Sequence, residues 1–172
     1  MKAVVVYESL WGNTAAVAGA IAEGLGSGAR ALSTAEATPE AVAGAELIVA
    51  GSPVMAFSLP TEMMRKGMAE DSGKAPRPPD LSHPSMRAWL ASLPPGAGRG
   101  RAAAFETRFR WSPGGATGAI LRRLRRAGYA SLGRKKFIIK GSYGPMRDGE
   151  FDRARRWGEE LARAAGGEIK EG

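Results

Sequence analysis

The sequence contains no cysteine and a single histidine, His83. The absence of cysteine excludes disulfide bonds, thiolate catalysis and cysteine-ligated zinc or iron–sulfur sites, and it is consistent with a reducing cytosol. With one histidine and no His/Asp/Glu cluster, a transition metal held by protein side chains is not expected. His83 lies in a proline-rich segment, and we interpret it as a solvated loop residue rather than a catalytic base.

Long apolar runs are also missing. No stretch approaches the ~20 residues needed to cross a bilayer, and the N-terminus lacks the charged, apolar and small-residue regions of a signal peptide. We therefore expect a cytoplasmic protein without a membrane span. The 172 residues, 44% of them hydrophobic, suffice to bury one substantial core. A single domain covering residues 1–172 is therefore predicted.

Acidic residues are scarce in one part of the chain. Residues 99–136 contain 11 basic residues and one acidic residue, Glu106, whereas the whole chain carries a net charge of +8. This block predicts a basic face, either simply solvated or able to dock an acidic partner or a nucleic-acid backbone. No nucleic-acid-binding motif accompanies it, so a nucleic-acid partner is not expected. The densest part of the block is Arg122, Arg123, Arg125 and Arg126.

Short apolar runs alternate with helical periodicities along the chain. This alternation predicts a parallel sheet covered by helices on both sides, with ligands bound at the carboxyl ends of the strands. The predicted strands are Lys2–Tyr7, Ala29–Ser33, Leu47–Ala50, Arg101–Phe105 and Phe137–Gly141. The predicted helices are Asn13–Leu25, Pro39–Gly44, Pro60–Glu70, Ser85–Leu93, Ala119–Ala127 and Gly149–Ala165.

The segment after the first strand, Glu8–Thr14, has the composition of an anion site. Where a strand turns tightly into a helix, unpaired backbone amides and the positive helix end converge. Ser9, Asn13 and Thr14 add hydroxyl and amide donors, and the segment contains no Lys or Arg. A bound phosphate would therefore be held by neutral donors. The residue pattern of this segment matches neither the nucleoside-triphosphate loop nor the dinucleotide loop, so both are excluded. A strand–helix turn without any ligand is the alternative.

The order hydroxyl-x-x-Gly-Asn-Thr resembles the FMN-phosphate loop of the flavodoxin family. The longer run Tyr-Glu-Ser-Leu-Trp-Gly-Asn-Thr is similar to flavodoxin-domain proteins of high-GC bacteria, and the resemblance covers nearly the whole chain through the order of its units. It implies an α/β, flavodoxin-like three-layer sandwich whose five-stranded parallel sheet has the order 2-1-3-4-5. It also implies that the first loop binds the FMN phosphate. The residues concerned are Ser9, Leu10, Trp11, Gly12, Asn13 and Thr14.

The resemblance also implies that two later loops hold the flavin ring. The loop after the third strand would cover the inner face, and the loop after the fourth strand, similar to the family's Phe-Asp-Thr-Arg, would meet the outer face and the pyrimidine edge. Each loop could instead pack on protein alone. No glycine occurs from Ser52 to Lys66, so a positive φ there would be strained. The candidate ring contacts are Pro53, Val54, Met55, Ala56 and Phe57, then Glu106, Thr107, Arg108 and Phe109.

Together these features predict an FMN-binding electron-transfer protein that works with a redox partner or a small acceptor. Two other functions remain open on the sequence. One is an FMN-dependent oxidoreductase of the NAD(P)H, quinone or protoporphyrinogen type. The other is a flavin-free interaction module that docks an acidic partner through its arginine-rich face.

Overall fold

The computed structural model describes residues 1–166, and its centre is a five-stranded parallel sheet of order β2-β1-β3-β4-β5. This is the predicted strand order, which is therefore confirmed. Strands β1 and β3 consist mainly of apolar residues, because both of their faces are covered by helices. The strands are β1 (Ala3–Tyr7), β2 (Ala29–Ser33), β3 (Leu47–Pro53), β4 (Arg101–Arg108) and β5 (Ala130–Ile138).

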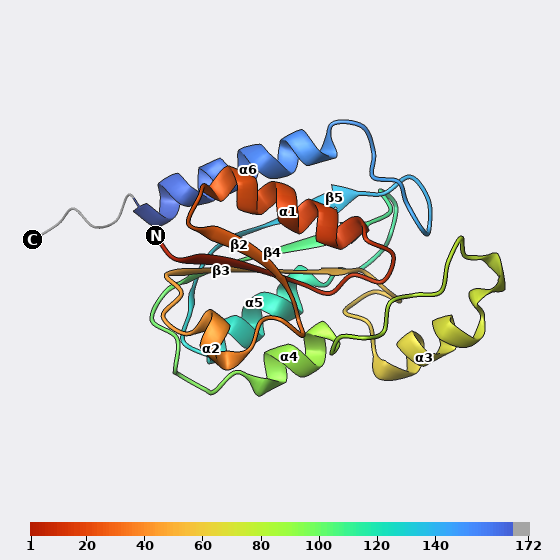
Figure 1. Cartoon of the computed structure of the whole chain (residues 1–172), viewed down its shortest axis with the longest axis horizontal. Helices are drawn as coiled ribbons and strands as arrows, with labels where there is room; N and C mark the ends of the chain where they lie inside the picture. The colour runs from red at the N-terminus through yellow and green to blue at the C-terminus, as the bar shows by residue number, and fades with distance from the viewer. Residues whose placement is uncertain (167–172) are drawn as a thin grey trace, which may run out of the picture.

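Helices cover both faces of the sheet (Figure 1). Helices α1 (Asn13–Leu25) and α6 (Glu150–Gly166) lie on one face. Beyond the edge of these layers, α3 (Glu62–Glu70) and the short 3-10 helix η1 (Ser72–Lys74) project to one side. None of the helices among residues 1–166 is long and apolar enough to span a membrane. The opposite face carries α2 (Pro39–Val42), α4 (Met86–Ser92) and α5 (Thr117–Arg126).

The strands divide their side chains between two apolar layers. In β1, Val4 and Val6 point toward the α2/α4/α5 side, where they join Trp89 of α4. The alternate residue Val5 points toward α1 and α6, where it joins Trp157. This alternation follows from the two-residue period of a strand. The sheet is thus buried on both faces. The loops at the carboxyl ends of its strands remain free to form a site.

Two glycines allow α1 and α6 to pack unusually close together. A Cβ atom on Gly24 would lie 1.9 Å from the backbone oxygen of Arg155, and one on Gly158 would lie 2.3 Å from that of Ile21. Backbone atoms at these positions cannot move aside as the end of a flexible side chain can. The contact between the two helices therefore depends on the missing side chains.

Several strand boundaries differ from the prediction, and β3 continues past Ala50 to Pro53. Strand β5 begins at Ala130 rather than Phe137, because its first residues lie at the sheet edge, where polar side chains are tolerated and no apolar run forms. Strand β4 continues past Phe105 to Arg108, pairing Ser52 with Glu106 and Pro53 with Thr107. The three polar residues predicted to open a loop are thus the buried end of a strand.

The close approach of α1 and α6 can be tested with two glycines of the same helix. We expect Gly24→Ala to lower the free energy of unfolding by about 3 kcal/mol, because the new methyl group meets backbone atoms. Gly19→Ala, with no atom within 4 Å of the new Cβ, should raise it by about 0.5–1 kcal/mol through helix propensity. Urea denaturation measures both values. Equal effects of the two substitutions would contradict the packing described.

Candidate functional site

The carboxyl edge of the sheet carries a cavity of about 460 Å³. Tyr7 pairs with Gly51, and Gly51 pairs with Phe105, so the ends of β1, β3 and β4 lie side by side. Segments that follow these strands line the cavity together with the α3–η1 region and the loop after β5. The lining residues are Ser9, Leu10, Trp11, Asn13, Thr14, Pro53, Val54, Met55, Met64, Gly67, Met68, Asp71, Ala75, Thr107, Arg108, Phe109, Ile139, Ser142 and Tyr143.

The structure brings most of the predicted site residues to this one cavity. The exceptions are Gly12, Ala56, Phe57 and Glu106, which do not line it. The sequence reasoning in turn missed the contributions of α3 and of the loop after β5. No single residue of those two segments resembles a binding motif, so their position became visible only with the fold.

The polar side of the cavity is formed by the first turn of α1. Gly12 takes a φ of 95°, which favours glycine, and its N–H donates to Ser9 Oγ at 3.1 Å. Within residues 1–166 no side chain caps this helix, whereas Thr38, Thr61 and Ser85 cap α2, α3 and α4. The first-turn N–H groups of α1 and the positive end of its dipole are therefore available to an anion.

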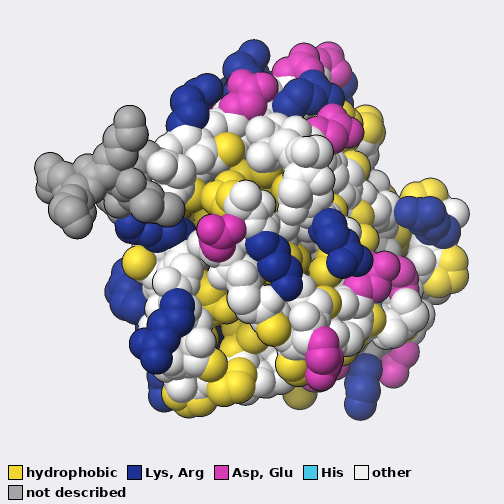
Figure 2. Space-filling view, turned by 60° about the vertical axis from the view of Figure 1, so that its left-hand side comes forward, with side chains coloured by type: hydrophobic (Ala, Val, Ile, Leu, Met, Phe, Trp, Pro, Cys, Tyr) yellow, Lys and Arg dark blue, Asp and Glu magenta, His cyan; other side chains and the backbone are white. Residues whose placement is uncertain are grey.

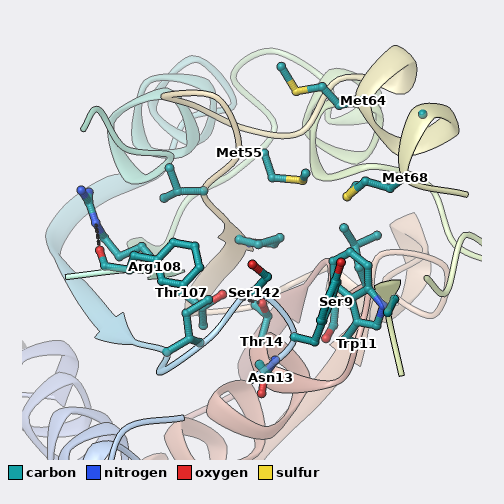
Figure 3. A pocket seen from close by; sticks show the side chains of 18 of the residues that line it. Ser9, Trp11, Asn13, Thr14, Met55, Met64, Met68, Thr107, Arg108 and Ser142 are labelled. Carbon is teal, nitrogen blue, oxygen red and sulfur yellow. Dashed lines mark hydrogen bonds between the residues drawn. The ribbon is translucent and has the colours of Figure 1, made fainter. Parts of the chain in front are cut away.

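Hydroxyl groups surround this turn. The Oγ1 atoms of Thr14 and Thr107 lie 2.8 Å apart, which links α1 to the end of β4. Figure 3 shows Ser9, Asn13, Thr14, Thr107 and Ser142 gathered along the same side of the cavity. The donors on this side are uncharged, as the composition of the first loop predicts.

One positive charge reaches the first loop from elsewhere in the chain. Arg77, in the segment after η1, donates from Nη2 to the backbone oxygen of Trp11 at 2.7 Å, and Trp11 Nε1 donates to the backbone oxygen of Arg77 at 3.1 Å. The same guanidinium nitrogen lies 3.1 Å from the place a Cβ on Gly12 would take. Arg77 therefore holds the outside of the loop, and it does not line the cavity.

The opposite side of the cavity is apolar and rich in sulfur. Met55 comes from the loop after β3, and Met64 and Met68 come from α3 (Figure 3). The thioethers lie across the cavity from the hydroxyl groups. Methionine is flexible and polarisable, and it packs well on aromatic surfaces. The cavity thus has one wall suited to an anion with hydroxyl groups and another suited to a flat apolar body.

The loop after β3 contains a strained turn. Met55 and Ser58 exchange two backbone hydrogen bonds of 2.8 and 3.0 Å, and the residues between them, Ala56 and Phe57, have φ values of 40° and 76°. This is the conformation expected to be strained without glycine. It is stabilised by Gly115, whose N–H donates to the Phe57 oxygen at 2.9 Å. The turn points Phe57 outward, 65% exposed, and its side chain does not line the cavity.

Glu106 points away from the cavity and into the protein. Its Oε1 accepts from Arg108 at 2.8 Å, and its Oε2 accepts from the backbone N–H groups of Ala116 and Thr117 at 2.7 and 3.0 Å, capping α5. Burial would raise the pKa of Glu106, but these hydrogen bonds outweigh burial and hold the pKa below its usual value. The predicted place of Glu106 in the cofactor site is therefore corrected, because protein groups already use both of its oxygens.

Arg108 and Phe109 contribute differently from their predicted roles. The guanidinium of Arg108 is held by Glu106 and by the backbone oxygen of Gly114 at 2.7 Å, so mainly its stem is free to line the cavity. The ring of Phe109 stacks on Trp111, with centroids 5.0 Å apart and planes 5° apart. Trp111 is 77% exposed. An aromatic pair therefore runs from the cavity to the surface.

A second buried carboxylate, Glu8, lies directly before the first loop. It is fully buried, its Oε1 lies 2.5 Å from Arg65 Nη1 of α3, and its Oε2 accepts from the backbone N–H of Met86 at 2.9 Å. Arg65 also donates to the backbone oxygen of His83 at 2.5 Å. No partner of Glu8 could be predicted from the sequence, because Arg65 is far away along the chain and nothing local distinguishes it from the neighbouring Lys66.

The interpretation of His83 as a solvated residue is wrong. The side chain is buried, and its Nε2 lies 2.9 Å from the backbone oxygen of Ser9. Its Nδ1 lies 3.3 Å from Thr34 Oγ1. His83 thus binds the backbone of the first loop without lining the cavity. Its flanking prolines suggested an exposed linker, whereas the segment folds back over the loop.

Comparison with known proteins identifies the architecture. No protein-family model matches the chain, and no curated protein does. A flavodoxin from the domain Archaea superimposes with a TM-score of 0.62 and 24% identity, over 96% of this chain and 99% of that one. The two-electron reduced flavodoxin of Megasphaera elsdenii gives a TM-score of 0.58 and 19% identity, over 94% and 98%. The chain has the flavodoxin-like fold.

A larger protein contains a similar unit. The rubredoxin oxygen:oxidoreductase of Desulfovibrio gigas matches with a TM-score of 0.60 and 15% identity, over 98% of this chain and 37% of that one. The flavodoxin-like fold therefore occurs both as a small protein and as a part of a longer one. At these identities the similarity concerns the fold, and the function must be argued from the cavity.

The ion pair between Glu8 and Arg65 can be tested by removing its cation. Arg65→Met keeps much of the side-chain volume but leaves the Glu8 carboxylate buried without its partner, so we expect the free energy of unfolding to fall by about 3–5 kcal/mol. Lys66→Met is the matched control, since Lys66 is exposed on the same helix, and should change it by less than about 0.5 kcal/mol. Chemical denaturation of both variants checks this, and similar values would refute it.

The lowered pKa of Glu106 predicts a dependence of stability on pH. A carboxyl group whose pKa is lower in the folded state contributes stability above its unfolded pKa, and this contribution is lost as the pH falls through the folded value. Glu106→Gln should therefore be less stable than the parent at pH 7. The difference should shrink as the pH falls below about 4.5, the ordinary value for this group.

Urea denaturation at several pH values between neutral and acidic measures this difference. Glu159→Gln, which changes an exposed residue of α6, is the control and should parallel the parent at every pH. A constant difference between Glu106→Gln and the parent would show that the buried carboxylate does not carry the effect.

Proposed function

We propose that this protein binds one FMN non-covalently in the cavity and transfers electrons. The observation that carries the proposal is the first turn of α1, which has no side-chain cap among the described residues and opens onto a cavity with hydroxyl donors. An uncapped helix end in a cavity favours an anion, and a phosphate ester fits neutral hydroxyl and amide donors. The volume of about 460 Å³ is typical of small-molecule sites.

The two sides of the cavity suit the two ends of FMN. Ser9, Asn13 and Thr14 would bind the phosphate, with backbone amides of residues 10 and 11 and of the first turn of α1 completing the site. The apolar side, with Met55, would accommodate the ring together with Pro53, Val54, Thr107 and Phe109. Glu106 is left out of this assignment because its oxygens are used within the protein.

The division of work between protein and cofactor follows from these contacts. When bound, the flavin supplies the capacity to accept and release electrons. The protein orients the ring and excludes water from its apolar side through the α3 methionines. Trp111, stacked on Phe109 and exposed, would present an aromatic surface toward a redox partner beside the cavity. The similarity to flavodoxins supports an electron carrier that works with such a partner.

The proposed phosphate site predicts a difference between two flavins. Thr14→Val removes a hydroxyl beside the first turn of α1 with little change in shape. We expect it to weaken FMN binding by about ten-fold, because a hydrogen bond to a charged group is lost. Riboflavin, which lacks the phosphate, should bind with the same affinity to parent and variant. Quenching of flavin fluorescence during titration measures both affinities.

A buried threonine at the start of another helix provides the control. Thr117→Val, in the first turn of α5, should leave the affinities for both flavins unchanged. An equal loss of FMN and riboflavin binding in Thr14→Val would mean that the phosphate lies elsewhere. If the parent protein takes up neither flavin, the proposed function is wrong. If the FMN-loaded protein sustains the oxidation of NADPH with a quinone as the acceptor, its function is that of an oxidoreductase rather than an electron carrier.

A further inference from the structure

A second hollow, of about 260 Å³, lies between α4 and α5. Leu59, Leu90 and Ala119 form an apolar floor, with Leu59 and Leu90 almost fully buried. Its rim is made of guanidinium groups. The arginines concerned are Arg87 of α4 and Arg122, Arg123 and Arg126 of α5.

These arginines have no acidic partners among residues 1–166. Arg122, Arg123 and Arg126 are exposed, and no hydrogen bond or ion pair of their side chains is found in the described part of the chain. Arg87 donates from Nε and Nη2 to the backbone oxygen of Leu59 at 3.3 and 3.0 Å, which adds no negative charge. Like charges gathered without counter-charges repel one another, and an anionic ligand would relieve this repulsion.

Two other residues of the basic block are paired with acidic side chains. Arg108 is neutralised by Glu106 inside the protein, and Lys135 of β5 lies 3.6 Å from Glu160 of α6. Figure 2 likewise shows acidic and basic side chains mixed over the upper part of that view, whereas Lys and Arg gather with few acids at its lower left. The excess positive charge of the chain is thus unevenly distributed, and the hollow is a place where it meets an apolar floor.

The combination of floor and rim indicates what could bind there. A nucleic-acid backbone would use the guanidinium groups but has no aliphatic side chain for a floor of leucine and alanine. An acidic protein segment can supply both, through carboxylates for the rim and an apolar side chain for the floor. Buried apolar anchors surrounded by arginine contacts are the usual arrangement of protein–protein interfaces.

We propose that the α4–α5 hollow docks an acidic segment of a partner protein, with an apolar side chain of that segment on Leu59, Leu90 and Ala119 and its carboxylates on the surrounding arginines. This surface goes beyond the proposed flavin function and stands without it, because none of its residues lines the cofactor cavity. It lies beside the start of α3, since Arg87 also binds the backbone oxygen of Pro60.

The test uses a fluorescent synthetic peptide of glutamate and leucine as the probe. Arg122→Glu combined with Arg126→Glu should weaken its binding at least about ten-fold, because both side chains border the hollow. The matched control combines Arg110→Glu with Arg125→Glu, which changes the net charge equally at exposed residues outside the hollow. The control should lose no more than about two- to three-fold through general electrostatics.

A third variant separates the floor from the charge. Ala119→Leu fills the hollow and leaves every arginine in place, so it should weaken the glutamate–leucine peptide and leave the binding of inorganic tripolyphosphate unchanged. All the substituted residues lie on the surface or partly so, and circular dichroism checks that each variant is folded.

Three results would overturn the proposal. The first is an equal loss of peptide binding in the two double variants, which would mean diffuse attraction. The second is a single-stranded RNA oligonucleotide that binds more tightly than the peptide and loses affinity in the Arg122/Arg126 variant. The third is no peptide binding at low salt. FMN titration of the same variants keeps the outcome separate from the proposed function, since flavin binding should be unchanged in all of them.

Discussion

The site depends on how the protein buries the carboxylate of Glu8. A buried charge without partners is strongly unfavourable, so the chain must supply them. It does so from α3 through Arg65, from the start of α4 through the Met86 N–H, and from the end of β3 through Ser52 Oγ at 3.5 Å. These partners come from three different segments of the chain. One carboxylate therefore fixes α3, with its methionines, relative to the loop that carries the hydroxyl and amide donors.

Glu106, at the end of β4, is a second buried carboxylate that needs partners. Comparing it with Glu8 explains why α1 has no side-chain cap. Glu106 is buried, is neutralised by an arginine, and caps a helix, α5. The helix beside Glu8 that could have been capped in this way is α1, but Glu8 turns to Arg65 and Met86 instead. The two carboxylates are thus used inside the protein at the ends of β1 and β4, which lie on either side of β3. The N-terminal end of α1, which neither carboxylate caps, faces the cavity. A binding site arises where the protein leaves its own polar groups unused.

The limits of sequence reasoning have a common physical cause. Helix α1 is predicted with its observed bounds, because an apolar stripe and a terminal glycine are local signals. The bounds of the alanine-rich edge strand β2 are also as predicted. The first loop is predicted for the same reason. His83, Glu106 and the Glu8–Arg65 pair were missed or misplaced because their partners are remote in sequence, and β5 because an edge strand needs no apolar run. The polar side of the cavity is formed mainly by residues close together in sequence, whereas its apolar wall includes α3, which is held by the buried Glu8–Arg65 ion pair.

The net charge of +8 is concentrated away from the cavity. The donors on the polar side of the cavity are uncharged, and Arg108 of β4, which lines the cavity, is already paired with Glu106. Solvent ions screen charges over about 8 Å at physiological ionic strength, so arginines around a different hollow act mainly on whatever binds there. A basic surface therefore need not tighten the hold on a phosphate. It acts instead on encounter with other molecules, and this separation would let the proposed cofactor binding and the proposed partner recognition change independently on one scaffold.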